Sequence, residues 1–345
     1  MAMLVLFIIL SILVNPSSAK TNYNVLSFGA RGNGVTDSTQ AFINAWAAAC
    51  ASTEPNTILV PKGRYLLGPV AFTGGCKSSD ITLQIDGTLV APADFRVLGQ
   101  AENWVSFDQV TGVSIIGGSL DAKGTALWVC KAQSGTNCPN GATPDTDDIH
   151  VQQSTNVKII NSSIKTGDDC VSIGPATNNL WIEGVTCGPG HGISIGSLGK
   201  DIEEEGVQNV SIKNTVFKGT QNGLRIKSWA RPSNGFVKGV QFIDVVMQNV
   251  QNPIIIDQNY CPHNLNCPNQ YWKPRQGYGG GRSTKCDGQK HSFQRYPKWA
   301  ENKSWVSPSN GFVKGVQFID AVMQNVQNSI IIDQKYCPHN LNFPS

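Results

Sequence analysis

Residues 147–195 read DDIHVQQSTNVKIINSSIKTGDDCVSIGPATNNLWIEGVTCGPGHGISI. Short runs with apolar first and last residues recur through this stretch and beyond it: Ile149-His150-Val151, Val171-Ser172-Ile173, Ile193-Ser194-Ile195, Leu224-Arg225-Ile226 and Ile254-Ile255-Ile256. They start at residues 149, 171, 193, 224 and 254, so the period is 22 residues at first and 30 or 31 later. Alternating apolar and polar residues are typical of strands with one buried face. The stretch therefore predicts short strands that recur at a slowly varying period.

A second series of β-rich runs keeps step with the first: Val157–Ile160, Leu180–Glu183, Val210–Lys213 and Val240–Ile243. Each period thus holds at least two strands with Asn- and Gly-rich turns between them, and no helical pattern that a βαβ sheet would need. Self-similarity at 20–30 residues with several strands per period is typical of a parallel β-helix. An antiparallel sandwich would not need equivalent positions to recur in register. We therefore predict an all-β chain folded as a parallel β-helix.

The N-terminal part of the chain continues this pattern of short strands less regularly. Further strands are expected at Ile81–Leu83, Thr88–Val90 and Val113–Ile116. Before them, Asp37-Ser38-Thr39 leads into an Ala-rich run from Ala41 to Cys50, which predicts a helix with an N-cap. The terminal repeat of a solenoid needs a cover for its apolar end. We expect this helix to be that N-terminal cap.

Composition excludes two broad classes of protein. The chain has 345 residues, of which 40% are hydrophobic and 15% charged, so extensive disorder is excluded. The formal net charge is +3, from 27 basic and 24 acidic residues. A nucleic-acid-binding protein should instead carry a concentrated basic surface. We expect no nucleic-acid partner.

Residues 1–19 predict a secretory signal. The apolar run Leu4–Val14 is followed by Pro16 and the small residues Ser17, Ser18 and Ala19, which fits cleavage before Lys20. Its eleven residues are too few to cross a bilayer, which needs about 20, and no later segment is long and apolar enough. We expect a secreted, extracellular protein without a membrane partner, in which disulfides form.

The ten cysteines have spacings that suggest local bridges. The expected pairs are Cys50–Cys76, Cys130–Cys138, Cys170–Cys187 and Cys261–Cys267, with Cys286 and Cys337 left over. Three N-x-S sequons, at Asn161, Asn209 and Asn302, are candidate glycan sites on a secreted surface.

Stacked coils bring equivalent residues about 4.8 Å apart and so create columns of side chains. The positions two before each strand of the first series form the column Asp147, Asp169, His191, Asn222 and Asn252. One residue into the strands, a second column contains His150, Ser172, Ser194, Arg225 and Ile255, with Lys227 further along. Asp148 and Asp168 flank the first two members of the first column. Acids, an imidazole and cations are thus expected on one side of a groove.

This combination favours glycoside hydrolysis, in which two carboxyl groups flank the scissile bond. Crowding Asp147, Asp168 and Asp169 raises the pKa of at least one of them. Arg225 can grip a sugar carboxylate bidentately, and Lys227 can add a point charge. Taken singly, the Asn residues can stabilise turns and the Asp pair can cap turns or bind calcium. Together and in register, they favour a catalytic site.

Four strings carry a resemblance to a known family: Thr146-Asp147, Gly167-Asp168-Asp169-Cys170, Gly190-His191-Gly192 and Arg225-Ile226-Lys227. They resemble the polygalacturonases, pectin-degrading glycoside hydrolases with a right-handed parallel β-helix. Further short segments resemble the plant branch of the family: Val171–Gly174, Cys187–Gly190, Ser194–Gly199 and Asn252–Gln258. The resemblance covers roughly residues 23–268 and implies secretion to the cell wall.

The resemblance implies inverting hydrolysis of α-1,4-linked galacturonic acid in polygalacturonate (pectin), by a monomer without a cofactor. It makes Asp168 the general acid and His191 the support of its charge state. Two further acids, Asp147 and Asp169, would activate water. The substrate-binding residues implied are Arg225, Lys227 and Tyr260. Whether cleavage is endo or exo stays open, and stacking alone allows a base–acid separation of one coil or two.

One departure from the family pattern lies beside the first catalytic Asp. The family pattern is Asn-Thr-Asp-Gly, whereas this chain reads Asp145-Thr146-Asp147-Asp148. Two added carboxylates beside the cleft are expected to repel an anionic polymer and raise the pKa values of the site. The alternative function is therefore an impaired or inactive pectin-binding β-helix. A pectate lyase is a weaker rival, because it would need calcium and an Arg base.

The C-terminal part contains a near-verbatim repeat. Residues 229–268 recur as 305–344 at an offset of 76, with six differences, one of which puts Phe343 in the place of Cys267. Residues 269–304 carry no coil pattern. We predict a signal at 1–19, a catalytic β-helix at 20–268, an irregular spacer at 269–304 and an added coil at 305–345.

Overall fold

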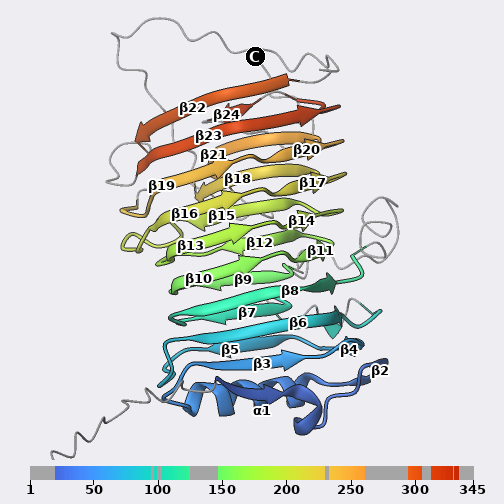
Figure 1. The fold of residues 1–345 in the computed structure, drawn as a ribbon. Coiled ribbons are helices and arrows are strands. Elements are labelled where there is room, and N and C mark those ends of the chain that lie inside the picture. The colour runs from blue at the N-terminus through green and yellow to red at the C-terminus, as the bar shows by residue number, and fades with distance from the viewer. Residues whose placement is uncertain are drawn as a thin grey trace, which may run out of the picture.

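The computed structural model describes residues 20–94, 97–98, 101, 103–124, 147–229, 233–260, 294–304, 312–328 and 330–333. Within these ranges, strands stack coil upon coil into a parallel β-helix, with one α-helix at the N-terminal end (Figure 1). The predicted fold class, an all-β parallel β-helix with an N-terminal capping helix, is confirmed.

Two sheets form the walls of the described coils. The larger comprises β1 (Thr21–Asn24), β2 (Asn33–Asp37), β3 (Asn56–Val60), β4 (Arg64–Leu66), β6 (Ile81–Val90), β8 (Val113–Asp121), β10 (Thr155–Ile160), β11 (Ser163–Lys165), β13 (Asn178–Glu183), β14 (Thr186–Cys187), β16 (Val207–Lys213), β17 (Val216–Lys218), β19 (Phe236–Ile243), β20 (Val246–Gln248), β22 (Gln294–Ser304) and β23 (Phe312–Gln324). The smaller comprises β5 (Val70–Thr73), β7 (Val105–Asp108), β9 (Ile149–Gln152), β12 (Asp169–Ile173), β15 (Gly192–Leu198), β18 (Asn222–Trp229), β21 (Asn252–Tyr260) and β24 (Ile331–Asp333). The helices are the 3₁₀-helix η1 (Val25–Phe28) and α1 (Thr39–Ala51).

The strand register of the smaller sheet follows the predicted second column. Ser172 on β12 lies between His150 on β9 and Ser194 on β15. Beyond Ser194 the column continues through Arg225 on β18 to Ile255 on β21. The alternate residues of these strands point inward and form the apolar core, as the alternation in the sequence predicts.

The predicted first column is wrong at one step. The register shifts between Asp169 and Val171, and Asp169 aligns with Gly192 rather than with His191. The cause is Cys170, which is completely buried and bonded to Cys187. This inward-facing residue interrupts the alternation, so that Asp168 instead of Asp169 meets His191.

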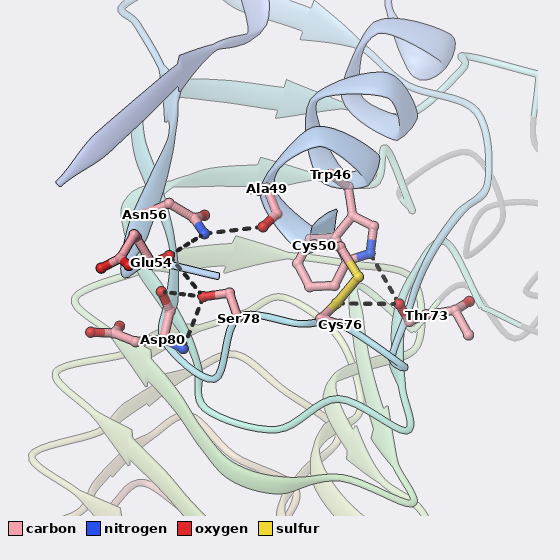
Figure 2. The surroundings of a disulfide bond; sticks show 9 residues. All are labelled: Trp46, Ala49, Cys50, Glu54, Asn56, Thr73, Cys76, Ser78 and Asp80. Atoms are coloured by element: carbon pink, nitrogen blue, oxygen red, sulfur yellow. Dashed lines mark hydrogen bonds between the residues drawn. A yellow bond between two sulfur atoms is a disulfide. The ribbon is translucent and has the colours of Figure 1, made fainter. Parts of the chain in front are cut away.

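The helix α1 covers the N-terminal end of the coils (Figures 1 and 2). The Trp46 ring packs 5.0 Å from the Phe72 ring, and Trp46 Nε1 donates to the Thr73 carbonyl at 3.1 Å. A disulfide joins Cys50, in the last turn of the helix, to Cys76. The expected helix is confirmed and begins two residues before Ala41, but its N-cap residue, Ser38, makes no side-chain capping hydrogen bond.

Two of the four expected disulfides, Cys50–Cys76 and Cys170–Cys187, are confirmed. The expected pairs Cys130–Cys138 and Cys261–Cys267 and the leftover Cys286 and Cys337 lie outside the described residues, as does the signal at 1–19. Asn161 and Asn209 are exposed, and Asn302 lies in β22. No helix of the described part of the chain is long and apolar enough to cross a membrane.

The C-terminal repeat stacks on its original. Strand β23 pairs with β19 and aligns Phe312 with Phe236, the same offset of 76 that separates the two copies in the sequence. Strand β24 pairs with β21 in the smaller sheet. The expected irregular spacer differs from the structure at its end, because its last eleven residues form β22, antiparallel to β23. Pairing satisfies the backbone groups that the edge of β23 would otherwise leave open.

We predict that the Cys170–Cys187 bond stabilises the coil that carries Asp168 and Asp169. Replacing both cysteines by alanine should lower the unfolding free energy by about 3 kcal/mol, because the bond closes a 17-residue separation in the unfolded chain. Urea unfolding measures the loss. A matched Cys50→Ala/Cys76→Ala variant should lose a similar amount and keep its site geometry. Unchanged stability without the Cys170–Cys187 bond would contradict this account.

Candidate active site

The candidate site lies along the smaller sheet, across the four successive strands β9, β12, β15 and β18. Asp147 lies two residues before β9, while Asp168 and Asp169 stand at the start of β12. His191 immediately precedes β15, and Arg225 and Lys227 belong to β18. Parallel pairing of these strands places their starts side by side. The acidic and cationic groups of the sequence prediction therefore converge through backbone register.

Asp147 and Asp169 form the buried centre of the site. Only 8% of Asp147 and 3% of Asp169 are exposed. The backbone N–H of Asp169 donates to Asp147 Oδ1 at 3.2 Å. Asp169 Oδ2 accepts hydrogen bonds from Lys227 Nζ at 3.1 Å and from the Ser194 hydroxyl. A cation and a hydroxyl thus both hold the Asp169 carboxylate.

Burial raises the pKa of Asp147 well above its ordinary value, and the neighbouring Asp169 and Asp168 raise it further. Lys227 and a hydrogen bond from the Ser172 hydroxyl act in the opposite direction. Burial by itself lowers the pKa of Lys227, but the attraction of Asp169 outweighs it, so that the pKa is raised. The site therefore combines a carboxyl that holds a proton readily with a firmly charged ammonium group.

Asp168 and His191 form a second pair at the edge of this centre. His191 Nδ1 lies 2.5 Å from Asp168 Oδ1. The backbone N–H of His191 donates to the backbone carbonyl of Asp168 at 2.6 Å. The Thr166 hydroxyl accepts the Asp168 N–H at 3.0 Å. The Asp168 side chain is 14% exposed and that of His191 20%, so both are more accessible than Asp147 and Asp169.

The cations have a separate support on β21. Arg225 Nη2 donates to Asp257 Oδ2 at 3.3 Å, and Asp257 is 1% exposed. Arg225 Cζ lies 5.3 Å and Lys227 Nζ 5.5 Å from the centroid of the Tyr260 ring, within cation–π range. Tyr260 in turn meets Trp229 edge to face. The two cations are thus held in place before any ligand arrives.

Comparison with known proteins gives this arrangement a family. The model of the glycosyl hydrolases family 28 matches residues 50–143 and 133–271. A polygalacturonase from Prunus persica is 51% identical over 316 positions, covering 78% of this chain and 79% of that protein. An exopolygalacturonase from Platanus acerifolia is 39% identical, over 71% of this chain and 77% of its own. The chain belongs to glycosyl hydrolase family 28.

The seven site residues predicted for this family 28 chain lie together. Asp168 and His191 form one bonded pair, and ligand atoms of this pair and of Asp169 lie within 4.8 Å of one another. The other set of contacts joins Asp147, Asp169, Lys227, Tyr260 and Arg225. The sequence prediction missed Asp257 as the partner of Arg225. The strand register could have identified Asp257, because it lies beside Lys227 on the following coil. It also gave no role to Ser172 and Ser194, although both stood in the predicted second column.

One trio in the site has the geometry of a metal site. Potential ligand atoms of Asp168, Asp169 and His191 all lie within 4.8 Å of one another. Lys227 Nζ already binds the Asp169 carboxylate, and its positive charge repels a metal ion. The donor set thus favours a site in which cationic side chains, rather than a metal ion, balance the charge of the carboxylates.

The expected effect of Asp148 on the cleft needs correction. Its side chain is completely buried, and neither carboxylate oxygen has a hydrogen-bond partner among the described residues. Burial first, and then Asp147 and Asp121, raise the pKa of Asp148 well above its ordinary value. Asp148 is therefore completely buried, where its neutral form is favoured, instead of standing exposed beside the cleft. The second added acid, Asp145, lies outside the described residues.

Asp148 should make the protein less stable as the pH rises above about 4, the ordinary pKa of an unfolded Asp. Above that pH the unfolded chain releases the proton while the folded chain retains it, which costs about 1.4 kcal/mol per pH unit. Asp148→Asn should remove this slope and be more stable than the original protein near pH 6.5.

Urea unfolding at several values between pH 4 and 7 measures the difference between the two proteins. An Asp86→Asn variant, changed at an exposed carboxyl, should keep the original slope. Parallel curves for Asp148→Asn and the original chain would mean that Asp148 is ionised in the folded state.

Proposed function

We propose that this chain hydrolyses α-1,4-galacturonosyl linkages of polygalacturonate with inversion of configuration. One observation carries the proposal: a cluster of carboxyl groups contacts a pair of cations that other side chains already hold in place. Asp169 binds Lys227 directly, and Lys227 shares the Tyr260 ring with Arg225. Hydrolysis needs the carboxyl groups, and an anionic sugar needs the cations.

Asp168 acts as the general acid, which protonates the leaving glycosidic oxygen. It is more exposed than the other two acids, and a hydrogen bond from His191 Nδ1 to its Oδ1 fixes its orientation. With Oδ1 accepting from the imidazole, the acidic proton resides on Oδ2. His191 thus supports Asp168 in its proton-donating form.

Asp147 and Asp169 activate the attacking water on the opposite face of the sugar. Lys227 offsets the negative charge of Asp169, which keeps this carboxylate available as an acceptor. The raised pKa of Asp147 suits it to receive the proton that water gives up. Inverting enzymes typically keep about 6.5–9.5 Å between the acid and base carboxyl groups to admit water. Ligand atoms of Asp168 and Asp169 lie within 4.8 Å of each other, so inversion is proposed from the family resemblance and not from this gap.

Arg225 and Lys227 bind galacturonate carboxylates, and Tyr260 lines the cleft beside them. Asp257 orients the guanidinium without occupying all of its donors, because Arg225 Nε has no hydrogen-bond partner in the described structure. Relatives are named both polygalacturonase and exopolygalacturonase, so the proposal covers endo and exo cleavage alike.

The rival functions have less support. An inactive pectin-binding β-helix was suggested by the extra acids, but Asp148 is completely buried and burial favours its neutral form. A pectate lyase would need calcium where Lys227 already holds Asp169. The proposal includes secretion to the plant cell wall, where pectin occurs, and action as a monomer that needs no cofactor.

The proposed reaction is tested by reducing-end release from polygalacturonate in EDTA across pH 4–7. The original protein should be active, and Asp168→Asn should lose about 10²–10⁴-fold in kcat because the general acid is gone. The exposed-site variant Asp86→Asn is the matched control. Folded protein that binds the polymer without cleaving it would establish the inactive pectin-binding alternative. Loss of activity in EDTA would favour the lyase.

Arg225→Gln should weaken selection for the anionic substrate. We expect kcat/KM on polygalacturonate to fall about 10–100-fold, as a charge-assisted contact of about 1.5–3 kcal/mol is lost. On a highly methyl-esterified polymer, whose ester groups carry no charge, the loss should be smaller. An equal loss on both polymers would indicate that Arg225 acts on the structure of the site rather than on the carboxylate.

A further inference from the structure

We propose that the outer face of the larger sheet carries a second binding site for galacturonan, formed around Trp181 and Lys158. These two residues are register partners on the neighbouring strands β13 and β10. Their coils are the ones whose strands β12 and β9 lie at the active site, but β10 and β13 belong to the other sheet. The choice of galacturonan as ligand rests on the proposed function, whereas the site itself rests on the geometry of these side chains.

A hollow of about 460 Å³ lies on this face of the larger sheet. Small-molecule sites typically have volumes of about 300–1,000 Å³ and combine apolar or aromatic side chains with a few polar groups. The hollow has this composition, and residues of β10 and β13 line it: Asn156, Val157, Lys158, Ile160, Asn179 and Trp181. Asn156, Lys158 and Asn179 are exposed and Trp181 is partly exposed, so the hollow opens to solvent.

Strand register sets the neighbours of the ring and of the cation. Lys158 aligns with Ser114 on the coil before it and with Trp181 on the coil after it. Trp181 in turn aligns with Ser211 on the following coil. A serine side chain is too short to cover an indole ring or a lysine stem. The register therefore places one aromatic ring and one cation side by side, with short neighbours on both flanks.

Glu183 fixes the orientation of the indole. Trp181 Nε1 donates to Glu183 Oε2 at 2.8 Å, and the two residues share a face because they lie two apart on β13. The other oxygen, Glu183 Oε1, accepts from Asn214 Nδ2 at 3.3 Å, and Lys213 is the register partner of Glu183 on the next coil. The Glu183 charge thus has its own donors and a neighbouring cation. The ring is held in place in advance, which lowers the entropic cost of binding.

Lys158 and two asparagines supply the polar groups of the hollow. In the part of the chain that the structure describes, Lys158 forms no ion pair. Asn179 Nδ2 donates to Asn156 Oδ1 at 2.5 Å, which joins the two amides across neighbouring coils. Both asparagines have a φ of 58°, a left-handed conformation that Asn adopts more readily than most residues. A charged donor and two amides therefore surround the indole.

These groups match one class of ligand. A sugar ring has an apolar face that packs on an aromatic ring, and hydroxyl groups at its edge that hydrogen-bond with amides. The ammonium group of Lys158 adds a preference for a carboxylate. A uronic acid combines all three features, and galacturonan repeats them along its chain. Because the hollow is open, a polymer can pass over it without ending there.

A second site on another face changes which substrate the protein holds rather than which bond it cleaves. A short oligomer in solution occupies one site at a time, whereas a pectin gel presents chains to both faces at once. Binding at one face then raises the effective concentration of polymer at the other. We therefore expect this site to matter on gels and to have no effect on short soluble substrates.

NMR titration with trigalacturonate tests the site directly, in the Asp168→Asn background so that the ligand is not consumed. The indole N–H resonance of Trp181 should shift on binding. The indole N–H of Trp229, whose ring meets Tyr260, reports binding at the active site. Lys158→Ala should weaken the affinity measured at Trp181 about two- to fivefold, as expected for an exposed ion pair, and leave the Trp229 response unchanged.

The two indole signals distinguish this proposal from the proposed function. A shift at Trp229 without one at Trp181 would overturn the second site. A shift at Trp181 alone would support the second site and refute binding at the proposed active site. Arg225→Gln should weaken only the Trp229 response, and loss of both responses would overturn the second site. Fully methyl-esterified trigalacturonate should shift Trp181 less, and an equal shift would overturn the assignment to an anionic sugar.

Adsorption to a polygalacturonate gel, in the same Asp168→Asn background, tests the contribution to polymer binding. Trp181→Ala should lower adsorption about tenfold, and Trp181→Phe, which keeps an aromatic face, should retain most of it. Lys218→Ala is the matched control, because this exposed lysine lies on β17 of the same sheet, and it should adsorb normally. With the active-site acid restored, Trp181→Ala should leave kcat/KM on a short oligogalacturonate unchanged. Undiminished gel adsorption by Trp181→Ala would overturn the proposal.

Discussion

Hydrogen bonds between the backbones of successive coils are the constraint on which the rest of this molecule depends. They hold neighbouring strands about 4.8 Å apart and in a fixed register, so a residue's position along its own coil decides which side chains it meets. Ser172 meets His150 on one side and Ser194 on the other for this reason alone. A slip of one residue would turn the polar column into the core and the apolar residues into the groove. The groove chemistry is therefore a consequence of backbone pairing.

The same register concentrates acids that repel one another, and the site is stable because its charges are matched locally. Lys227 binds Asp169, and the buried Asp257 binds Arg225. Within the described ranges Asp147 forms no ion pair, and its pKa is raised instead. Both kinds of compensation serve catalysis in the proposed function, because one leaves a fixed anion and the other a carboxyl that exchanges its proton.

The C-terminal repeat shows how strongly register depends on sequence. Strand β23 pairs with β19, whose sequence it repeats, so that Phe312 stacks on Phe236 and Asn328 donates to Asn252. Like residues fit one another along a solenoid because each coil presents the same surface to the next. The antiparallel strand β22 then ends the stack and covers the edge that a further coil would occupy (Figure 1).

The sequence by itself determined the fold class, the pairing partners of the strands and the identity of the acidic and cationic groups, because strand alternation and period are local properties. Only the tertiary structure decided which of two adjacent acids meets His191, because the inward turn of Cys170 shifts the register there by one residue. It also decided that Asp148 is completely buried and that Asp257 supports Arg225. Burial and pairing across coils depend on where a side chain points in space, and the order of residues along one coil does not specify that direction at a bulge.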